Sequence, residues 1–317
     1  MSVYWAFFLT VSMTTDIQPV DNAEHVDKKA RNDMDEGFNL TFDHLQPLRI
    51  LVDVIQNILN RVEVKIVKND TFEGIHIESI DPKHVCLIVA RLGATVKMCA
   101  DDSTFCVDTS TLNTCLKAVQ SHFSLDMKSN PNTSDITMCA YENISNNYWT
   151  TFNIPTLVHD GDSVRLTDLD YDYTIEIDLN TLRNIVKNTI ALKGEEINLT
   201  VEVPKNKNSY NYTVFTITTD GAATQKHQFH SITENKPGST CVIRTEEGGV
   251  DIPEVDNFEK KYSENFSAHY LSLFLKSMER QVISMRLSPT KPLILNYPLG
   301  TESSYICFVL APKAKDT

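Results

Sequence analysis

The feature that most constrains the fold is an alternation of single amphipathic helices with groups of short strands, beginning at Phe38. Apolar residues recur at helical spacing in four segments: 46–60, 109–121, 178–191 and 267–280. Between them, apolar and polar residues alternate as in strands with one buried face, which predicts strands at 62–67, 74–79, 85–92, 135–141, 173–177, 197–203, 212–218, 226–231, 282–287, 292–297 and 305–310. Few helices among many short strands predict an α+β fold in which sheets dominate.

The length and composition allow two domains. The chain has 317 residues, of which 41% are hydrophobic, enough to bury a core of ordinary size. The alternation lapses near the middle of the chain, where a proline and the cluster H-D-G-D predict a connector. We therefore expect an N-terminal extension at 1–37, whose polar residues 14–37 are typical of disorder, a first domain at 38–152, a linker at 153–171 and a second domain at 172–317.

The sequence carries none of the motifs expected of common enzyme classes. It has no P-loop, no G-x-S-x-G and no Cys/His pair with local support. Its seven cysteines are scattered without C-x-x-C spacing, which predicts reduced thiols in an intracellular compartment. Asp168, Asp170 and Asp172 alternate along the chain, but the glycine and distal glutamate of a calcium loop are missing. We predict a non-enzyme with no cofactor and no metal.

The charge distribution distinguishes the helices from the rest of the chain. The net charge of −13 argues against a generally basic nucleic-acid binder, yet it leaves a locally basic surface open. Opposite their apolar stripes, the four helices carry the bases Arg49, Lys117, Arg183, Lys187, Lys276 and Arg280. Asp53 is the only acid well inside these faces. Ordinary solvated helix faces are one interpretation; a sparsely positive surface for non-specific phosphate contact is the other.

Each helix pairs its polar face with an apolar stripe that we expect to be buried. The stripes include Ile58 in the first helix, Cys115 in the second and Ile190 in the third, whereas Asn113 is expected on the exposed side. These positions test the helical phase residue by residue.

Six segments, in order along the chain, carry a family resemblance: FNLTFDHLQPLRILVDVIQNILNRVEVKI (38–66), GIHIESIDPKHVCLIV (74–89), CVDTSTLNTCLKAV (106–119), VRLTDLD (164–170), SAHYLSLFLKSM (267–278) and KPLILNYPLG…YICFVLAPK (291–313). Their most specific parts are the D-x-x-H-V turn, the D-L-D segment and the L-A-P-K tail. Together they resemble the proliferating cell nuclear antigen family, the eukaryotic DNA sliding clamps.

The resemblance implies a closed homotrimeric ring. Each subunit would have two similar domains, with antiparallel sheets outside and helices around a central hole that holds duplex DNA without sequence specificity. The implied function is that of a polymerase processivity factor in DNA replication and repair, in the nucleus or, for a viral protein, at the viral replication site. The implied partners are double-stranded DNA, further copies of the chain, a DNA polymerase, a clamp loader and other proteins that carry short clamp-binding motifs, with no membrane involved.

The resemblance also implies two groups of site residues. The DNA-facing group comprises Arg49, Lys117, Lys187 and Lys276 at basic family positions, with Arg183 and His269 at or beside others and Arg280 on the same helix face as Lys276. The partner-peptide pocket comprises Ile80, His84, Val85 and Leu87 from the turn, Leu157, Val158 and Leu166 from the linker, and Pro292, Ala311 and Pro312 near the tail. An apolar pocket edged by exposed backbone is a common arrangement for peptide capture.

Departures from the family pattern leave two other functions open. The extension at 1–37 has no counterpart, the linker lacks its usual portion after T-D-L-D, segment 232–262 is longer, and Gln56 replaces a base. Such divergence suits a viral or protist clamp, or a checkpoint-like or degenerate clamp subunit that acts as an interaction scaffold. The apolar N-terminal run and several N-x-S/T sequons keep a secreted all-β glycoprotein as a third hypothesis.

Overall fold

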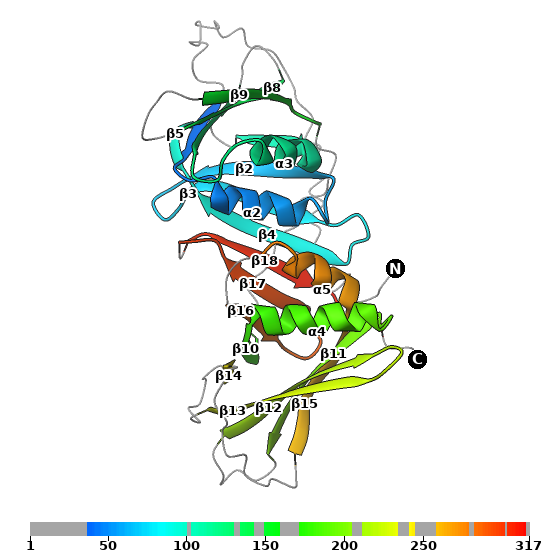
Figure 1. Ribbon diagram of the computed structural model, residues 1–317. Helices are drawn as coiled ribbons and strands as arrows, with labels where there is room; N and C mark the ends of the chain where they lie inside the picture. Colours follow the sequence, from blue (N-terminus) through cyan, green and yellow to red (C-terminus); the bar gives the residue numbers. More distant parts are fainter. Residues whose placement is uncertain are drawn as a thin grey trace, which may run out of the picture. The chain divides into compact units, whose positions relative to one another are not determined.

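Helices form in all four segments where apolar residues repeat at helical spacing. The computed structural model describes residues 37–99, 103–129, 134–142, 149–158, 171–204, 211–233, 241–244, 258–278, 282–301 and 303–314. Its helices are α2 (Gln46–Ile55), α3 (Thr109–Lys117), α4 (Leu179–Ala191) and α5 (Ala268–Leu275) (Figure 1). With three largely antiparallel sheets among the described residues, they confirm the predicted α+β class. Ring assembly and a pair of similar clamp domains stay predictions.

By contacts, the chain divides into two compact units. Unit 1 contains Met1–Arg49, Arg61–Glu78 and Arg91–Arg165, and unit 2 contains Ile50–Asn60, Ser79–Ala90 and Leu166–Thr317. The second half of α2 and the turn after residue 80 therefore belong to unit 2. The domain boundaries expected at residues 152 and 172 stay predictions.

Unit 1 contains a five-stranded antiparallel sheet. Its strand order is β5 (Thr95–Cys99), β1 (Phe38–Phe42), β7 (Ser124–Ser129), β8 (Asp135–Tyr141) and β9 (Trp149–Pro155). Strands β3 (Glu73–Ile80), β2 (Arg61–Lys68) and β6 (Thr104–Asp108) follow one another in the nine-stranded sheet. Phe38 of β1 stacks on Phe105 of β6 with ring centroids 5.1 Å apart, so the core of unit 1 lies between these strands.

Unit 2 contains the four-stranded sheet and the rest of the nine-stranded sheet. The four-stranded sheet has the order β13 (Gln225–Thr233), β12 (Asn211–Asp220), β11 (Glu196–Pro204) and β15 (Phe258–Ser267). The other strands follow the order β14 (Cys241–Arg244), β10 (Tyr173–Asp178), β16 (Val282–Leu287), β17 (Leu293–Pro298), β18 (Tyr305–Leu310) and β4 (Cys86–Gly93). Helices α4 and α5 lie side by side (Figure 1), and the rings of Phe274 in α5 and Phe308 in β18 stack at 4.4 Å.

Every strand predicted from the sequence is present, and strands β1, β5, β6, β7, β9, β14 and β15 were not predicted. Segments such as SLDMKS in β7 and FEKKYSENFS in β15 mix charged and apolar residues without a long apolar run. Pairing with neighbouring strands, rather than local hydrophobicity, stabilises these segments as strands.

Helix ends and some buried positions differ from the prediction. The first helix ends at Ile55 rather than at residue 60, because the Asn57 side chain donates to the Asp53 carbonyl oxygen at 2.6 Å and closes the last turn. On α4, Ile190 is 44% exposed. On α3, Asn113 is only 3% exposed, so the helical phase there is rotated toward the polar side.

Matching aspartate caps begin α3 and α4. The Asp108 carboxylate accepts the backbone N–H of Thr111 at 2.7 Å, and the Asp178 carboxylate accepts that of Thr181 at 2.7 Å. Each threonine hydroxyl also donates to the same carboxylate. These bonds satisfy free N–H groups at the helix start, and the hydrogen bonds from Thr111 lower the pKa of Asp108.

Candidate functional site: the docking turn and the basic helices

The turn between β3 and β4, residues 81–85, is organised by one buried carboxylate. Asp81 is 2% exposed, and its carboxylate accepts the backbone N–H groups of Lys83 at 3.0 Å, Val85 at 2.7 Å and Cys86 at 2.5 Å. An aspartate that binds the backbone just after it is a common way to set a tight turn. We call residues 81–85 the docking turn.

His84 owes its place in this turn to backbone geometry. Its φ of 54° lies in the left-handed region, which histidine tolerates better than β-branched residues do. Its N–H donates to the Asp81 carbonyl oxygen at 2.8 Å, and its side chain is exposed. The ring is therefore open to solvent, while the backbone shapes the turn.

Tyr270 of α5 attaches the docking turn to the helix. Its hydroxyl donates to the second carboxylate oxygen of Asp81 at 2.6 Å, although the two residues are 189 positions apart. Burial, reinforced by this hydrogen bond to Asp81, raises the pKa of Tyr270 well above its ordinary value. The tyrosine therefore stays protonated and remains a donor to the carboxylate.

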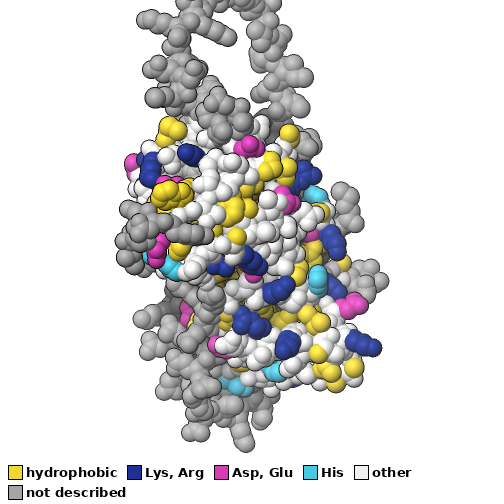
Figure 2. Space-filling view, turned by 45° about the horizontal axis from the view of Figure 1, so that its top comes forward, with side chains coloured by type: hydrophobic (Ala, Val, Ile, Leu, Met, Phe, Trp, Pro, Cys, Tyr) yellow, Lys and Arg dark blue, Asp and Glu magenta, His cyan; other side chains and the backbone are white. Residues whose placement is uncertain are grey.

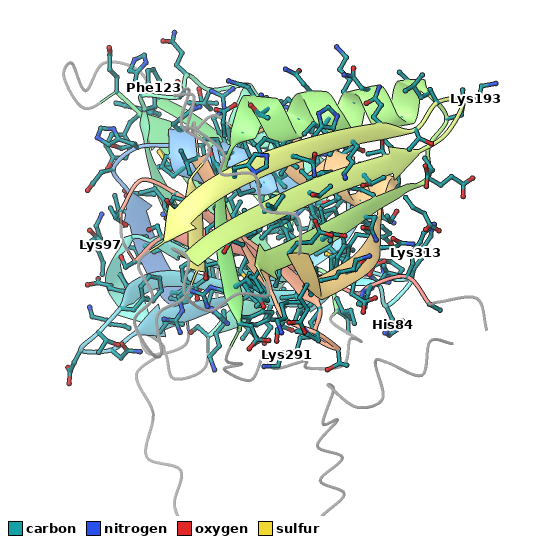
Figure 3. The ribbon with its side chains drawn as sticks, turned by 90° about the horizontal axis from the view of Figure 1, so that it is seen from below. His84, Lys97, Phe123, Lys193, Lys291 and Lys313 are labelled. Carbon is teal, nitrogen blue, oxygen red and sulfur yellow. The ribbon has the colours of Figure 1, made fainter. Side chains whose placement is uncertain are left out.

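The C-terminal tail lies against the docking turn. The Ala311 N–H donates to the Val85 carbonyl oxygen at 3.0 Å, and the Lys313 N–H donates to the Asn265 carbonyl oxygen at 2.8 Å. The Lys313 ammonium also pairs with Glu196 of β11 at 2.8 Å. Figure 3 shows His84 and Lys313, both of unit 2, on the right of the view.

The turn and tail residues expected in the partner pocket thus come together in unit 2. Ile80, Val85, Ala311 and Pro312 are half-buried, so each keeps part of its apolar surface exposed. Leu87 is only 2% exposed and Pro292 is also buried, so these two side chains belong to the layer beneath.

Two of the linker residues expected in the pocket belong to unit 1, whereas the turn and tail residues belong to unit 2. Leu157 and Val158 belong to unit 1 and are 39% and 78% exposed. The Leu157 N–H donates to the Cys106 carbonyl oxygen at 2.8 Å, which holds this segment beside β6. Leu166 lies outside the described residues.

Two of the three predicted DNA-facing arginines, Arg49 and Arg183, donate to the ends of neighbouring helices. In unit 1, Arg49 donates to the Val119 carbonyl oxygen at 3.3 Å, just beyond the end of α3. In unit 2, Arg183 donates to the Leu275 carbonyl oxygen at 3.0 Å and to that of Met278 at 2.7 Å, at the end of α5. Cations stabilise such helix ends, so these guanidinium groups have a structural role.

The remaining basic side chains of the helices are exposed. Lys117 of α3, Lys187 of α4 and His269 of α5 are exposed, as is Lys276, which follows α5 and donates to the Asn57 side chain at 3.3 Å. Arg280 lies outside the described residues. Lys and Arg side chains gather in the lower part of the view in Figure 2, with acidic side chains interspersed, although the whole chain carries −13.

Polar bonds join the end of α2 to the end of α5 within unit 2. The Ser277 hydroxyl donates to the Asp53 carboxylate, which also accepts the Gln56 side-chain amide at 2.9 Å. Asp53, the one acid expected inside the helix faces, therefore makes hydrogen bonds in this junction.

Sequence reasoning missed the two residues that organise the docking turn. Asp81 was visible as the first residue of the D-x-x-H-V pattern, but its burial was not expected. Tyr270 lies among the apolar residues of the predicted helix at 267–280, and nothing local indicates its bond to Asp81. Its side chain is half-buried rather than buried, which leaves the hydroxyl able to reach the carboxylate.

No metal centre is found in the described part of the chain, where His, Cys, Asp and Glu nowhere form a group of three or more suited to an ion. Asp168 and Asp170 lie outside it, and Asp172 accepts a hydrogen bond from the Ser288 hydroxyl at 2.6 Å. None of the described helices is both long and apolar enough to cross a membrane.

Comparison with known proteins adds no family assignment: the chain matches no protein-family model, and no curated protein is similar enough to count as a match.

Proposed function

We propose that this chain is a subunit of a DNA sliding clamp, a processivity factor that encircles duplex DNA and docks replication and repair proteins. The observation that carries the proposal is the pairing of the docking turn with the tail. Asp81 holds the turn, the Ala311–Val85 hydrogen bond attaches the tail, and half-buried apolar side chains line both. A short apolar peptide could bury this surface and pair with nearby backbone.

The exposed lysines support the DNA-binding part of the proposal. Lys187 makes no ion pair or side-chain hydrogen bond with any other described residue, and Lys276 binds only a neutral amide. Few and non-specific phosphate contacts suit a protein that must slide. Acids far from these lysines are screened beyond about 8 Å at physiological salt, so the net charge does not oppose the contact.

Free sheet edges support the self-assembly part. Among the described strands, β9 pairs only with β8 and β13 pairs only with β12, so each leaves one backbone edge open. We propose that β9 of one subunit pairs with β13 of the next, a head-to-tail contact that closes into a ring when the rotation is one third of a turn.

Light scattering on the purified chain tests this assembly. The proposed ring has a molar mass of three times 35.9 kDa, and a strictly monomeric protein at micromolar concentration contradicts it. Single proline substitutions at positions 151, 152 and 153 of β9 test which strand edge forms the contact. Successive N–H groups of a strand point to opposite sides, and proline has none. Only the substitutions at positions whose N–H faces away from β8 should therefore dissociate the ring.

Titration with a clamp-binding peptide tests the docking surface separately. Val85→Asp and Pro312→Asp should each weaken peptide binding by about tenfold or more, since a charge in the apolar contact must be desolvated. The matched control is Val282→Asp, at a position 49% exposed on β16, which should leave binding unchanged. Equal binding by all three variants would assign the peptide to another surface.

Duplex binding tests the lysines. The double change Lys187→Glu with Lys276→Glu should weaken binding to duplex DNA. The slope of log affinity against log salt concentration should become shallower by the equivalent of roughly two phosphate contacts, while the molar mass stays unchanged. If both the affinity and the salt slope match those of the unaltered protein, these helices do not face DNA.

A further inference from the structure

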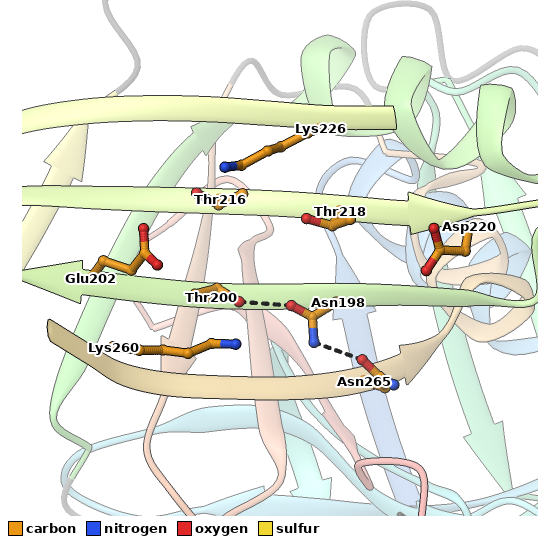
Figure 4. Close-up of a pocket in the computed structure, with 9 residues that line it drawn as sticks. All are labelled: Asn198, Thr200, Glu202, Thr216, Thr218, Asp220, Lys226, Lys260 and Asn265. Carbon is orange, nitrogen blue, oxygen red and sulfur yellow. Dashed lines mark hydrogen bonds between the residues drawn. The ribbon is translucent and has the colours of Figure 1, made fainter. Parts of the chain in front are cut away.

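A polar hollow of about 340 Å³ lies on one face of the four-stranded sheet, and none of its lining residues is among those assigned above to DNA or peptide binding (Figure 4). All of its lining residues are polar or charged and belong to unit 2: Asn198, Thr200, Glu202, Thr216, Thr218, Asp220, Lys226, Lys260 and Asn265. The alternate positions of β11, Ile197, Leu199 and Val201, point to the core. The hollow is therefore the outward face of the sheet.

Strand register places the hydrophilic side chains of the hollow in rows. Thr216 of β12 lies directly opposite Thr200 of β11. Lys226 of β13 lies opposite Thr218, and Glu202 of β11 lies opposite Lys260 of β15. Opposed side chains on one face stand about 5 Å apart, so one small molecule can contact several rows at once.

Two ammonium groups converge on the middle row. Figure 4 shows Lys226 reaching in from β13 and Lys260 reaching in from β15, both with Nζ directed toward the pair Thr216 and Thr200. Neither lysine forms an ion pair or side-chain hydrogen bond with another residue that the structure describes. Two cations that flank the Thr216–Thr200 pair from opposite sides favour an anion between them.

The Thr216 hydroxyl supplies a vacant donor at the same spot. The residue is 3% exposed, and its Oγ1 is buried without a hydrogen-bond partner among the described residues. By contrast, the Thr200 hydroxyl donates to the Asn198 side chain at 2.7 Å. A buried hydroxyl without a partner is costly, and an anion oxygen in the hollow would accept its hydrogen bond.

Two carboxylates in the hollow limit the kinds of ligand that fit beside the lysines. Glu202 makes no side-chain hydrogen bond with another described residue, and it would repel a bare anion while accepting hydrogen bonds from hydroxyl groups. Asp220 at the far end accepts the Thr224 hydroxyl at 2.9 Å. Among the described residues that line the hollow none is aromatic, so none of these side chains would stack on a base.

We propose that the polar hollow binds a small phosphorylated sugar, with the phosphomonoester between Lys226 and Lys260 and the Thr216 hydroxyl donating to it. The sugar hydroxyls then donate to Glu202. The volume lies at the lower end of the range for small-molecule sites, which fits a ligand of this size.

Calorimetric titration of the full chain at low salt tests the site, with ribose 5-phosphate, inorganic phosphate and ribose as separate probes. Ribose 5-phosphate should bind more tightly than phosphate, and ribose should not bind. The double change Lys226→Ala with Lys260→Ala should weaken ribose 5-phosphate binding by about tenfold or more, whereas Lys128→Ala, at an exposed position of β7 in unit 1, should not. Glu202→Gln should weaken ribose 5-phosphate binding and leave phosphate binding equal or stronger.

Thr216→Val separates a loss of ligand binding from a loss of folding. Valine keeps the shape and removes a hydroxyl without a partner, so the protein should unfold at the same or a higher temperature while binding ribose 5-phosphate more weakly. The proposal is overturned if ribose 5-phosphate does not bind at millimolar concentration. It is also overturned if the double variant Lys226→Ala with Lys260→Ala binds ribose 5-phosphate as tightly as Lys128→Ala does. Equal competition by an oligonucleotide without terminal phosphates would assign the hollow to phosphodiesters and overturn it as well.

Discussion

Replacing Asp81 by alanine removes the acceptor of four hydrogen bonds: two from the docking turn, one from Cys86 at the start of β4 and one from Tyr270. The Cys86 N–H is buried and cannot be hydrated in the variant, whereas the Lys83 and Val85 N–H groups are partly accessible. A hydrogen bond to a charged group contributes about 1.5–3 kcal/mol, and part of this is recovered wherever water reaches the donor. We expect the free energy of unfolding to fall by about 3–5 kcal/mol.

Two milder variants divide that loss. Asp81→Asn keeps one acceptor oxygen for the turn and should cost about 1–2 kcal/mol. Tyr270→Phe removes only the bond to α5 and should cost a similar amount. In a double-mutant cycle, the Asp81 and Tyr270 changes should show a coupling of about 1–2 kcal/mol, since each removes the same bond.

Urea unfolding followed by circular dichroism measures these costs, and hydrogen exchange locates them. Since two units can unfold in separate steps, the exchange of the Val85 and Cys86 amides is the more specific readout. Both amides should lose protection in Asp81→Ala. A loss below about 1 kcal/mol with both amides still protected would refute the view that this carboxylate holds the turn.

Three further predictions concern the cap of α3, the titration of Tyr270 and the two basic residues of α4. Asp108→Ala should cost about 1 kcal/mol at neutral pH, and since the Thr111 bond lowers the pKa of Asp108, that contribution should vanish as pH falls below the ordinary value of 3.8, measured by denaturation against pH. The pKa of Tyr270 is raised on folding, so the unaltered protein should lose stability as pH rises above 10. In Tyr270→Phe the free energy of unfolding should fall less steeply with pH in that range. An equal fall in both proteins would contradict this prediction. Arg183→Met should lower the free energy of unfolding by about 1–3 kcal/mol, because the hydrogen bonds to the end of α5 are lost. Lys187→Met should change the free energy of unfolding by no more than about 0.5 kcal/mol. A larger loss in Lys187→Met than in Arg183→Met would contradict the structural role of Arg183.

The regular elements with clear periodicity were predictable from the sequence. All four helices and the strands with alternating apolar residues occur where the pattern places them. Strands such as β7 and β15 were not, since their residues become strands by pairing with distant segments. The end of α2 was also missed, because the Asn57 side chain, not the apolar pattern, ends the helix.

The candidate site was predictable in position but not in its contacts. The docking turn and the tail lie together through the bond from Ala311 to Val85, and their role in binding a partner stays a prediction. The bond between Tyr270 and Asp81 spans 189 positions, so no local pattern indicates it. Arg183 was placed on the polar face of its helix, yet its long side chain turns to the end of α5, a choice that depends on tertiary packing.

Topological retention on DNA tests the encircling function most directly. The protein is incubated with a linear duplex that carries biotin at both ends, streptavidin is added to block the ends, and the complex is washed at high salt. Because phosphate contacts weaken steeply with salt, only a closed ring should remain on the blocked duplex. We predict retention through the wash and release when the duplex is cut between the blocks. Loss of the protein in the salt wash, whether or not the ends are blocked, would contradict a clamp that encircles DNA.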